Sequence, residues 1–174
     1  MDSRDEAIRR RASADGVDAV LEQWRRERPD LDTTAMGTIG RLSRASHLVQ
    51  QRLKANFARF DLEPAAFDVL ATLRRAGPPY RLSPSALVRT AMVTSGAITQ
   101  RLDRLEARGL VRREPDSSDG RAVVVELTEA GSALVDEVLP SHLAVLTDVL
   151  SEVSTADRGG LDRGLRALLG ALAP

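Results

Sequence analysis

The sequence of 174 residues contains no cysteine. This absence excludes disulfide bonds, thiolate metal sites, cysteine nucleophiles and thiol-based redox sensing. No apolar run reaches the roughly 18 residues needed to span a membrane, and the charged start lacks the apolar segment of a signal peptide. We therefore expect a cytoplasmic protein that does not associate with membranes. Its length suits one domain with helical extensions.

Net charge is also absent, because 25 basic residues balance 25 acidic ones. The charges are nevertheless unevenly distributed. Residues 69–113 contain nine arginines but only two acidic residues, Asp103 and Glu106, whereas residues 114–174 contain four arginines and eleven acidic residues. A basic segment beside an acidic one is expected where one surface contacts a polyanion. On charge alone, a mixed solvated surface explains the pattern equally well.

Catalytic and metal-binding patterns are missing too. His47 and His142 lie far apart in the sequence, neither has a closely spaced ligand partner, and no glycine-rich phosphate loop occurs. We therefore expect no enzymatic activity, no catalytic residue, no bound metal and no cofactor.

Helical periodicity is what the sequence does contain. It predicts helices over about residues 15–28, 34–60, 64–76, 83–91 and 95–108. Pro64 and Pro84 suit the first turns of their helices, and Gly109 suits a helix end. A last helical region starts at Thr128 and is broken either at Pro140 or near residues 154–155.

The segments "LVRREP" and "RAVVVELT" predict two strands joined by the turn "DSSDG", and residues 80–82 predict a short extended piece. Two short helices followed by a hairpin form a winged helix-turn-helix. The predicted fold class is therefore mainly α with a small β-hairpin wing, flanked by long helices.

In this arrangement the helix at residues 95–108 enters the major groove, and the hairpin tip reaches toward the minor groove. Small, polar or basic side chains on these elements are the candidate DNA contacts. They are Ser83, Arg89, Thr94, Ser95, Thr99, Gln100, Arg104, Asp119 and Arg121. Taken singly, Ser83, Thr94 or Ser95 can be a helix cap and Arg121 an ordinary surface charge, so the prediction depends on their combined order.

The stretch "ITQRLDRLEAR" places Ile98, Leu102 and Leu105 on one apolar helix face that Arg101 shares. A buried guanidinium needs an anionic partner. Asp68 is the candidate, because it lies among apolar residues of the helix at residues 64–76 and an Asp68–Arg101 pair would satisfy both charges. Arg113 is near enough in sequence to enter the same site.

The run "SGAITQRLDRLEARGLVRREPDSSDGRAVVVELTEAG" closely resembles the recognition helix and wing of MarR-family transcription regulators, which carry "RLxxLExxGLVxR" and "DxxDxRxxxVxLTxxG". The resemblance implies a homodimer that binds a pseudo-palindromic operator in double-stranded DNA, usually as a repressor. We expect an organisation in four parts. Residues 1–14 are charged and lack periodicity, so they are expected to form a mobile tail, and residues 15–32 contain an extra helix. The resemblance implies a helical dimerisation region at 33–62 and 130–174 and a DNA-binding lobe at 63–129.

Four residues resemble the ligand site of the urate-responsive branch of this family, in which an additional N-terminal helix supplies a tryptophan. The matching positions are Trp24, Asp68, Arg101 and Arg113. This resemblance implies a planar anionic heterocycle such as urate, since arginine forks suit its oxygens and an aromatic face covers its ring. Three alternatives stay open: an internal salt bridge with Trp24 in packing, a different metabolite, and a winged-helix module that binds protein.

Overall fold

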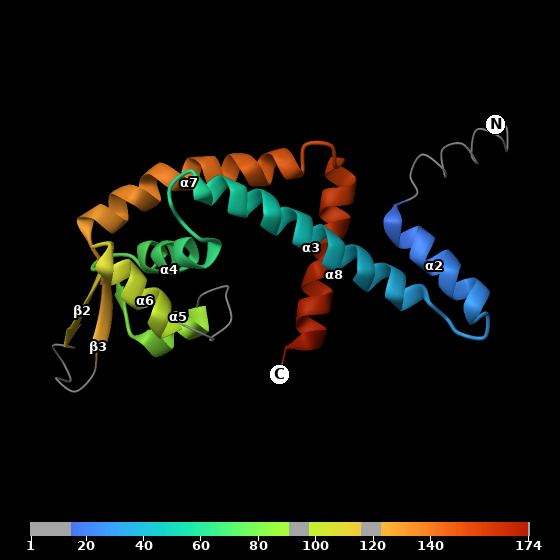
Figure 1. Cartoon of the computed structure of the whole chain (residues 1–174), viewed down its shortest axis with the longest axis horizontal. Coiled ribbons are helices and arrows are strands. Elements are labelled where there is room, and N and C mark those ends of the chain that lie inside the picture. The colour runs from blue at the N-terminus through green and yellow to red at the C-terminus, as the bar shows by residue number, and fades with distance from the viewer. Residues whose placement is uncertain (1–14, 91–97, 116–122, 174) are drawn as a thin grey trace. The chain divides into compact units, whose positions relative to one another are not determined.

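The computed structural model describes residues 15–90, 98–115 and 123–173, so the predicted tail at 1–14 lies outside it. The helices and strands, in chain order, are α2 (Gly16–Glu27), α3 (Thr34–Ala58), α4 (Pro64–Arg75), β1 (Arg81–Leu82), α5 (Pro84–Thr90), α6 (Ile98–Ala107), β2 (Val111–Pro115), β3 (Val123–Leu127), α7 (Glu129–Val149) and α8 (Thr155–Leu172) (Figure 1). The chain divides into two compact units between residues 51 and 52, within α3.

The first unit contains α2 and the first part of α3. The Asp15 carboxylate accepts hydrogen bonds from the backbone amides of Val17 and Asp18, and the Asp18 carboxylate accepts one from the amide of Asp15. This capping box starts α2 where the sequence predicts a helix. Arg41 of α3 donates to both carboxylates, and Leu21 is buried, with 6% of its surface exposed.

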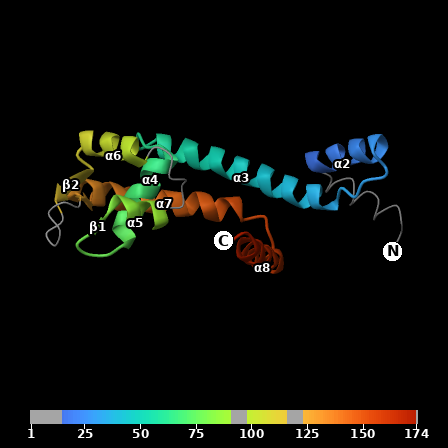
Figure 2. The same cartoon turned by 90° about the horizontal axis from the view of Figure 1, so that it is seen from below.

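The second unit has a continuous apolar core around α4. The amphipathic faces of α4, α6 and α7 and the inner face of the sheet supply it. Its most completely buried side chains include Leu70, Leu73, Leu87, Leu102, Leu105, Val111, Val125, Val135 and Val138. α4 contacts α5, α6, α7 and β3. Figures 1 and 2 show α4, α5 and α6 gathered at the end of α7 that adjoins the strands.

Aromatic rings close one side of this core. Phe57 of α3 stacks on Phe67 of α4, with ring centroids 4.7 Å apart. The imidazole of His142, on α7, lies 5.4 Å from the Phe57 ring and 5.2 Å from the Phe67 ring. The three rings therefore join α3, α4 and α7.

The sheet is antiparallel, with strand order β1-β3-β2. Arg112 of β2 pairs in register with Glu126 of β3, and their side chains form an ion pair of 3.0 Å on the more exposed face. Val125 and Val111 are buried on the opposite face, as the alternation of a half-buried strand requires. The two predicted hairpin strands are confirmed, while the turn between them lies outside the described residues.

A close approach joins the end of the wing to α7. Gly109 lies just after the last turn of α6 and has a φ of +69°, as expected for a glycine that ends a helix. The Thr128 hydroxyl donates to the carbonyl oxygen of Gly109 at 2.7 Å and accepts from the amide of Gly131 at 3.0 Å. Gly131 is buried so tightly that a Cβ there would collide with the carbonyl oxygen of Leu110.

The last helical region breaks between α7 and α8, the second of the two positions open from sequence. Ser154 caps α8 by accepting a hydrogen bond from the amide of Asp157, and Arg158 donates to the carbonyl oxygen of Leu150 at the end of α7. Pro140 lies inside α7, which continues through it. No residue of α8 is buried within this chain, among those that the structure describes.

Candidate nucleic-acid interface

α5 is fixed at both ends. The Ser83 hydroxyl accepts a hydrogen bond of 3.2 Å from the amide of Ala86, so Ser83 caps the helix in the structure. At the other end, Arg75 of α4 donates to the carbonyl oxygen of Thr90 at 2.6 Å. Arg89, a predicted phosphate contact, is exposed in the last turn of α5. α5 is therefore a rigid support that presents one basic side chain.

α6 separates an inner from an outer face. Leu102 and Leu105 are almost fully buried, whereas Thr99, Gln100 and Arg104 are exposed. An exposed polar face backed by two buried leucines allows side chains to reach another molecule while the helix stays anchored. Four further candidate DNA contacts lie outside the described residues: Thr94, Ser95, Asp119 and Arg121.

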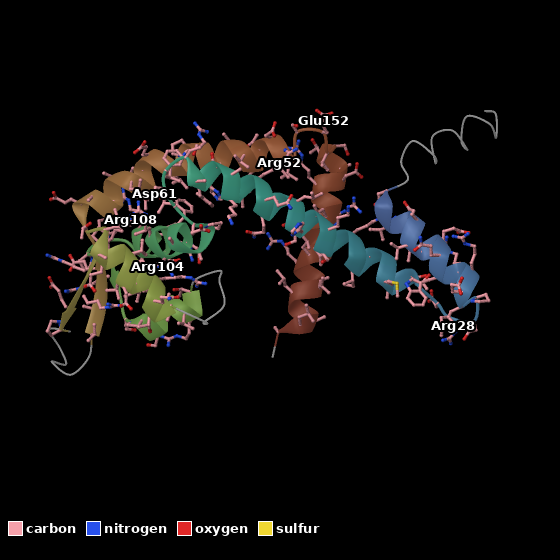
Figure 3. All side chains as sticks on the ribbon, in the orientation of Figure 1. Arg28, Arg52, Asp61, Arg104, Arg108 and Glu152 are labelled. Atoms are coloured by element: carbon pink, nitrogen blue, oxygen red, sulfur yellow. The ribbon has the colours of Figure 1, made fainter. Side chains whose placement is uncertain are left out.

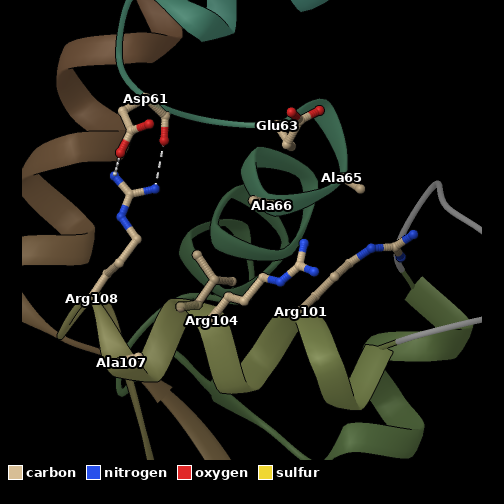
Figure 4. A pocket seen from close by; sticks show the side chains of 9 residues that line it. Asp61, Glu63, Ala65, Ala66, Arg101, Arg104, Ala107 and Arg108 are labelled. Carbon is tan, nitrogen blue, oxygen red and sulfur yellow. Dashed lines mark hydrogen bonds and ion pairs between the residues drawn. The ribbon is translucent and has the colours of Figure 1, made fainter.

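A pocket of about 650 Å³ lies between α6 and the start of α4 (Figure 4). Its walls combine acidic side chains from the turn before α4, small side chains of α4, two arginines of α6, and Arg108 directly after α6. The lining residues are Asp61, Glu63, Ala65, Ala66, Arg101, Arg104, Leu105, Ala107 and Arg108. Because three arginines outnumber two acids, the pocket favours an anion over a cation.

Arg101 is partly buried at this pocket. Its Nη1 atom is buried and has no hydrogen-bond partner among the described residues. A buried guanidinium nitrogen without an acceptor is unfavourable. Asp68 is half-buried on α4, and its carbonyl oxygen accepts a hydrogen bond from Thr72 at 2.6 Å. The Asp68–Arg101 pair stays a prediction, and the Nη1 atom makes no hydrogen bond to Asp68 in this structure.

Arg113 of β2 is fully engaged with α6. Its Nη1 atom lies 2.8 Å from Glu106 Oε2, and its Nη2 atom lies 2.7 Å from Asp103 Oδ1. Nη2 also donates to the carbonyl oxygen of Thr99 at 3.3 Å. The structure thus places Arg113 beside α6, on acceptors that the sequence did not suggest.

Trp24 belongs to the first unit, whereas Asp68, Arg101 and Arg113 belong to the second. It lies on α2 with 43% of its surface exposed. Its part in a ligand site stays a prediction from the resemblance.

Arg108 is a site residue that sequence reasoning missed. It donates from Nη1 to the carbonyl oxygen of Asp61 at 2.6 Å, and its Nη2 atom lies 3.5 Å from Asp61 Oδ2 (Figures 3 and 4). Asp61 has a positive φ of 52°, a left-handed backbone conformation in which aspartate is enriched. The arginines near the end of α6 are evident in the sequence, but nothing in the sequence showed which backbone oxygen Arg108 contacts.

The described residues contain no group of three or more histidine or acidic side chains that could hold a metal ion. Within the same ranges, no helix has both the length and the apolar character needed to cross a membrane.

Comparisons with known proteins identify the lobe. A sequence profile of the MarR family matches residues 60–122. The transcriptional regulator PecS of Dickeya dadantii is 44% identical over 154 residues, which make up 88% of this chain and 90% of PecS. The chain belongs to the MarR family. It is therefore a DNA-binding transcriptional regulator and not an enzyme.

Two solved structures share this MarR fold. A mutant of E. coli MarR, solved in complex with operator DNA, is 26% identical with a TM-score of 0.69, over 79% of this chain and 97% of that one. Bordetella bronchiseptica BpsR, whose DNA binding is regulated by 6-hydroxynicotinic acid, is 26% identical with a TM-score of 0.68, over 79% of this chain and 95% of that one. The predicted winged helix-turn-helix fold is confirmed.

Proposed function

We propose that this MarR-family chain is a homodimeric repressor that binds a pseudo-palindromic operator and leaves DNA when a small anionic aromatic ligand, such as urate, binds. Relatives support each half of this proposal. E. coli MarR has been solved on operator DNA. The DNA binding of BpsR responds to 6-hydroxynicotinic acid, which is itself a small aromatic acid.

The outer face of α6 supports its role as the DNA-reading helix. Thr99 and Gln100 offer hydrogen-bonding groups near its start, and Arg104 adds a positive charge one turn later. These side chains suit base edges and phosphates in a major groove. In a two-fold symmetric dimer, two such helices would read half-sites about one helical turn of DNA apart.

The apolar residues of α8 support the homodimer. Leu161, Leu169 and Leu172 are exposed by 50%, 68% and 71%, and no described residue of α8 is buried. An exposed stripe of leucines on a long helix is unfavourable in water unless another surface covers it. A second copy of the chain supplies an equivalent surface through two-fold symmetry.

The observation that carries the ligand proposal is the buried, unpartnered Nη1 atom of Arg101 at the wall of the pocket. In Figure 4 the Arg101 guanidinium points away from Arg104 and Arg108, so in this proposal the side chain turns toward the pocket and its Nη1 atom gains an acceptor from the bound anion. The pocket volume of about 650 Å³ lies in the range of sites for small organic ligands. Arg101 belongs to α6, so a ligand bound to it acts directly on the helix that we assign to DNA.

In the proposed mechanism, the ligand anion competes with the Asp68 carboxylate for the Arg101 guanidinium. A ligand shifts a conformational equilibrium only by the difference in its affinity for the two states. Binding that pulls Arg101 toward the pocket would favour an α6 position unsuited to DNA. The indole of Trp24, exposed on α2, is the predicted aromatic cover for the ligand ring.

The test is fluorescence anisotropy with a labelled DNA fragment from directly upstream of the chain's own gene, titrated with protein and then with urate. We expect binding that weakens steeply with salt, because contacts to phosphates release counterions. We expect urate to release the wild-type protein from the fragment. DNA binding that is independent of salt would favour the protein-interaction alternative.

Arg101→Gln and Trp24→Ala test the ligand site. Both variants should bind DNA and lose the response to urate, while Arg59→Gln, which removes an exposed arginine outside the pocket, should keep it. Unchanged urate release in both site variants would refute the assigned site. DNA binding without any urate effect in the wild type would favour the alternative that a different metabolite is the effector.

A further inference from the structure

Asp103 and Glu106 are the only acidic residues between positions 69 and 113, and both lie on α6. Two carboxylates on a helix that approaches DNA would repel the phosphates. Their side chains are 56% and 37% exposed, so solvent reaches both. The structure shows a single side chain that engages both carboxylates.

That side chain is Arg113 of β2. Its guanidinium bridges the two carboxylates, through Nη2 to Asp103 at 2.7 Å and through Nη1 to Glu106 at 2.8 Å. The second oxygen of Glu106 accepts a hydrogen bond of 2.9 Å from the backbone amide of Arg113. Glu106 is therefore held by both the main chain and the side chain of one wing residue.

The acceptors of Arg113 follow one face of α6. The carbonyl oxygen of Thr99 accepts from Nη2 at 3.3 Å, so the three contacted residues are spaced i, i+4 and i+7. This spacing places them on one side of the helix over two turns, a length of about 10 Å. One planar guanidinium thus joins the wing strand to most of the described length of α6.

We propose that Arg113 is a positioning residue that neutralises Asp103 and Glu106, so that α6 can approach DNA without repulsion from its own carboxylates. The inference rests on the proposed function, because it takes α6 as the DNA-reading helix. It differs from a direct phosphate contact, since both terminal nitrogens of Arg113 already face acceptors on α6.

A single exposed ion pair contributes little to stability. A guanidinium shared by two carboxylates and a carbonyl forms a network that leaves less charge exposed than separate ion pairs do. The Arg113 side chain is only 27% exposed, so water screens it less than the two acids. Losing Arg113 would leave two negative charges on α6 at once. This effect is electrostatic and therefore reversible by neutralising the acids.

The experiment compares Arg113→Gln with the triple variant Arg113→Gln/Asp103→Asn/Glu106→Gln, on the DNA fragment from upstream of the gene. We expect the single variant to bind about tenfold more weakly, as two uncompensated surface charges would produce. We expect the triple variant to recover most of that loss. The ratio of wild-type to Arg113→Gln affinity should also shrink as salt rises, because screening weakens the repulsion.

Asp103→Asn/Glu106→Gln in the presence of Arg113 is the matched control, and it should bind DNA at least as tightly as wild type. Arg113→Lys guards against misfolding of the glutamine variant. One ammonium covers one carboxylate, so we expect a loss of about threefold, again reversed by neutralising the acids. Thermal unfolding of each variant verifies that the lobe is folded.

A triple variant as weak as Arg113→Gln would overturn the proposal, and would indicate that Arg113 contacts DNA or a ligand directly or acts only through geometry. A wild-type protein that fails to bind the fragment would instead contradict the proposed function. The two failures are distinguishable because the first requires tight wild-type binding.

Discussion

The second unit contains two regions that differ in how far their leucine side chains are exposed to solvent. In the lobe formed by α4, α6, the sheet and the start of α7, side chains such as Leu70 and Leu105 are at most 1% exposed. On α8, Leu161 and Leu169 are at least half exposed. The lobe therefore completes its apolar core within one chain, whereas α8 does not.

This difference separates two sources of stability. The lobe gains its hydrophobic free energy from its own folding, and it should unfold at a temperature independent of protein concentration. A helix that leaves its leucines in water gains that free energy only by association, which depends on concentration. Variants in the two regions should therefore change different measurements.

Gly131→Ala is expected to have the largest effect on the lobe. The added Cβ would overlap the carbonyl oxygen of Leu110 and would lie 2.7 Å from Leu127 Cδ1, where neither backbone nor core can move freely. We expect a loss of about 3 kcal/mol or more in the free energy of unfolding, as for overpacked core positions. Chemical denaturation followed by circular dichroism measures this loss.

Gly164→Ala in α8 is the matched control, because its Cβ would have no described heavy atom within 4 Å apart from the adjacent residues and the nearby backbone of its own helix. Alanine in a helix is favoured over glycine by about 0.8–1 kcal/mol, so this variant should be neutral or slightly stabilising. Equal destabilisation by both substitutions would show that the contrast between the two regions is wrong.

Leu105→Ala should follow in size. Leu105 is 1% exposed, and truncating a buried leucine costs about 2–5 kcal/mol through lost transfer free energy and the cavity that remains. Leu169→Ala removes the same atoms from a side chain that is 68% exposed. It should leave the unfolding free energy of the lobe unchanged, and a loss as large as that of Leu105→Ala would contradict the contrast.

Leu169→Glu tests what covers α8. If α8 forms the proposed homodimer interface, a charge at this position should weaken dimerisation about tenfold or more, the equivalent of one buried leucine side chain. Sedimentation across a range of concentrations measures the change. An unaltered dimer, or a wild-type protein that stays monomeric, would exclude this face as the interface.

The sequence predicted the lobe well because its signals are local. Pro64 marks the start of α4 and Gly109 follows the end of α6, as predicted, and the segments "LVRREP" and "RAVVVELT" on either side of the turn "DSSDG" predicted both wing strands. The break in the last helical region was ambiguous, since Pro140 and Ser154 both offered a physical reason for it. The structure places it at Ser154, where a cap and the carbonyl contacts of Arg158 stabilise the turn.

The site was harder to predict because its contacts depend on relative placement. Arg101 was predicted on an apolar face and is partly buried, but its partner was inferred only from charge and burial. Glu106 and Arg113 are close in sequence, but their contact depends on how the turn after α6 directs β2 back along the helix. The sequence does not determine that direction. The sequence did not indicate that the carbonyl oxygen of Leu110 lies where a side chain at Gly131 would be, so the need for glycine there was not predicted.

The smallest expected effect concerns the two histidines, one in each unit. His142 lies against Phe57 and Phe67, and its Nδ1 atom is buried without a hydrogen-bond partner among the described residues. Burial lowers the pKa of His142 below the ordinary value of 6.5. The folded state therefore binds a proton less readily than the unfolded state.

Stability must then rise with pH wherever the unfolded chain holds more protons than the folded one. The contribution of neutral His142 is fully present above pH 6.5, declines as pH falls through that value, and levels off below the lowered pKa of the folded state. Denaturation midpoints of wild type and His142→Leu between pH 5 and 8 measure it, and the leucine variant should lose this part of the pH dependence.

His47→Gln is the control, because His47 is exposed on α3 beside Gln51, away from any aromatic cluster in the described residues. It should retain the pH profile of the wild type. A pH profile of stability altered by His47→Gln but not by His142→Leu would mean that the buried environment of His142 does not cause the pH dependence. The sensitive histidine would then lie on the exposed surface, contrary to what the burial of the two rings implies.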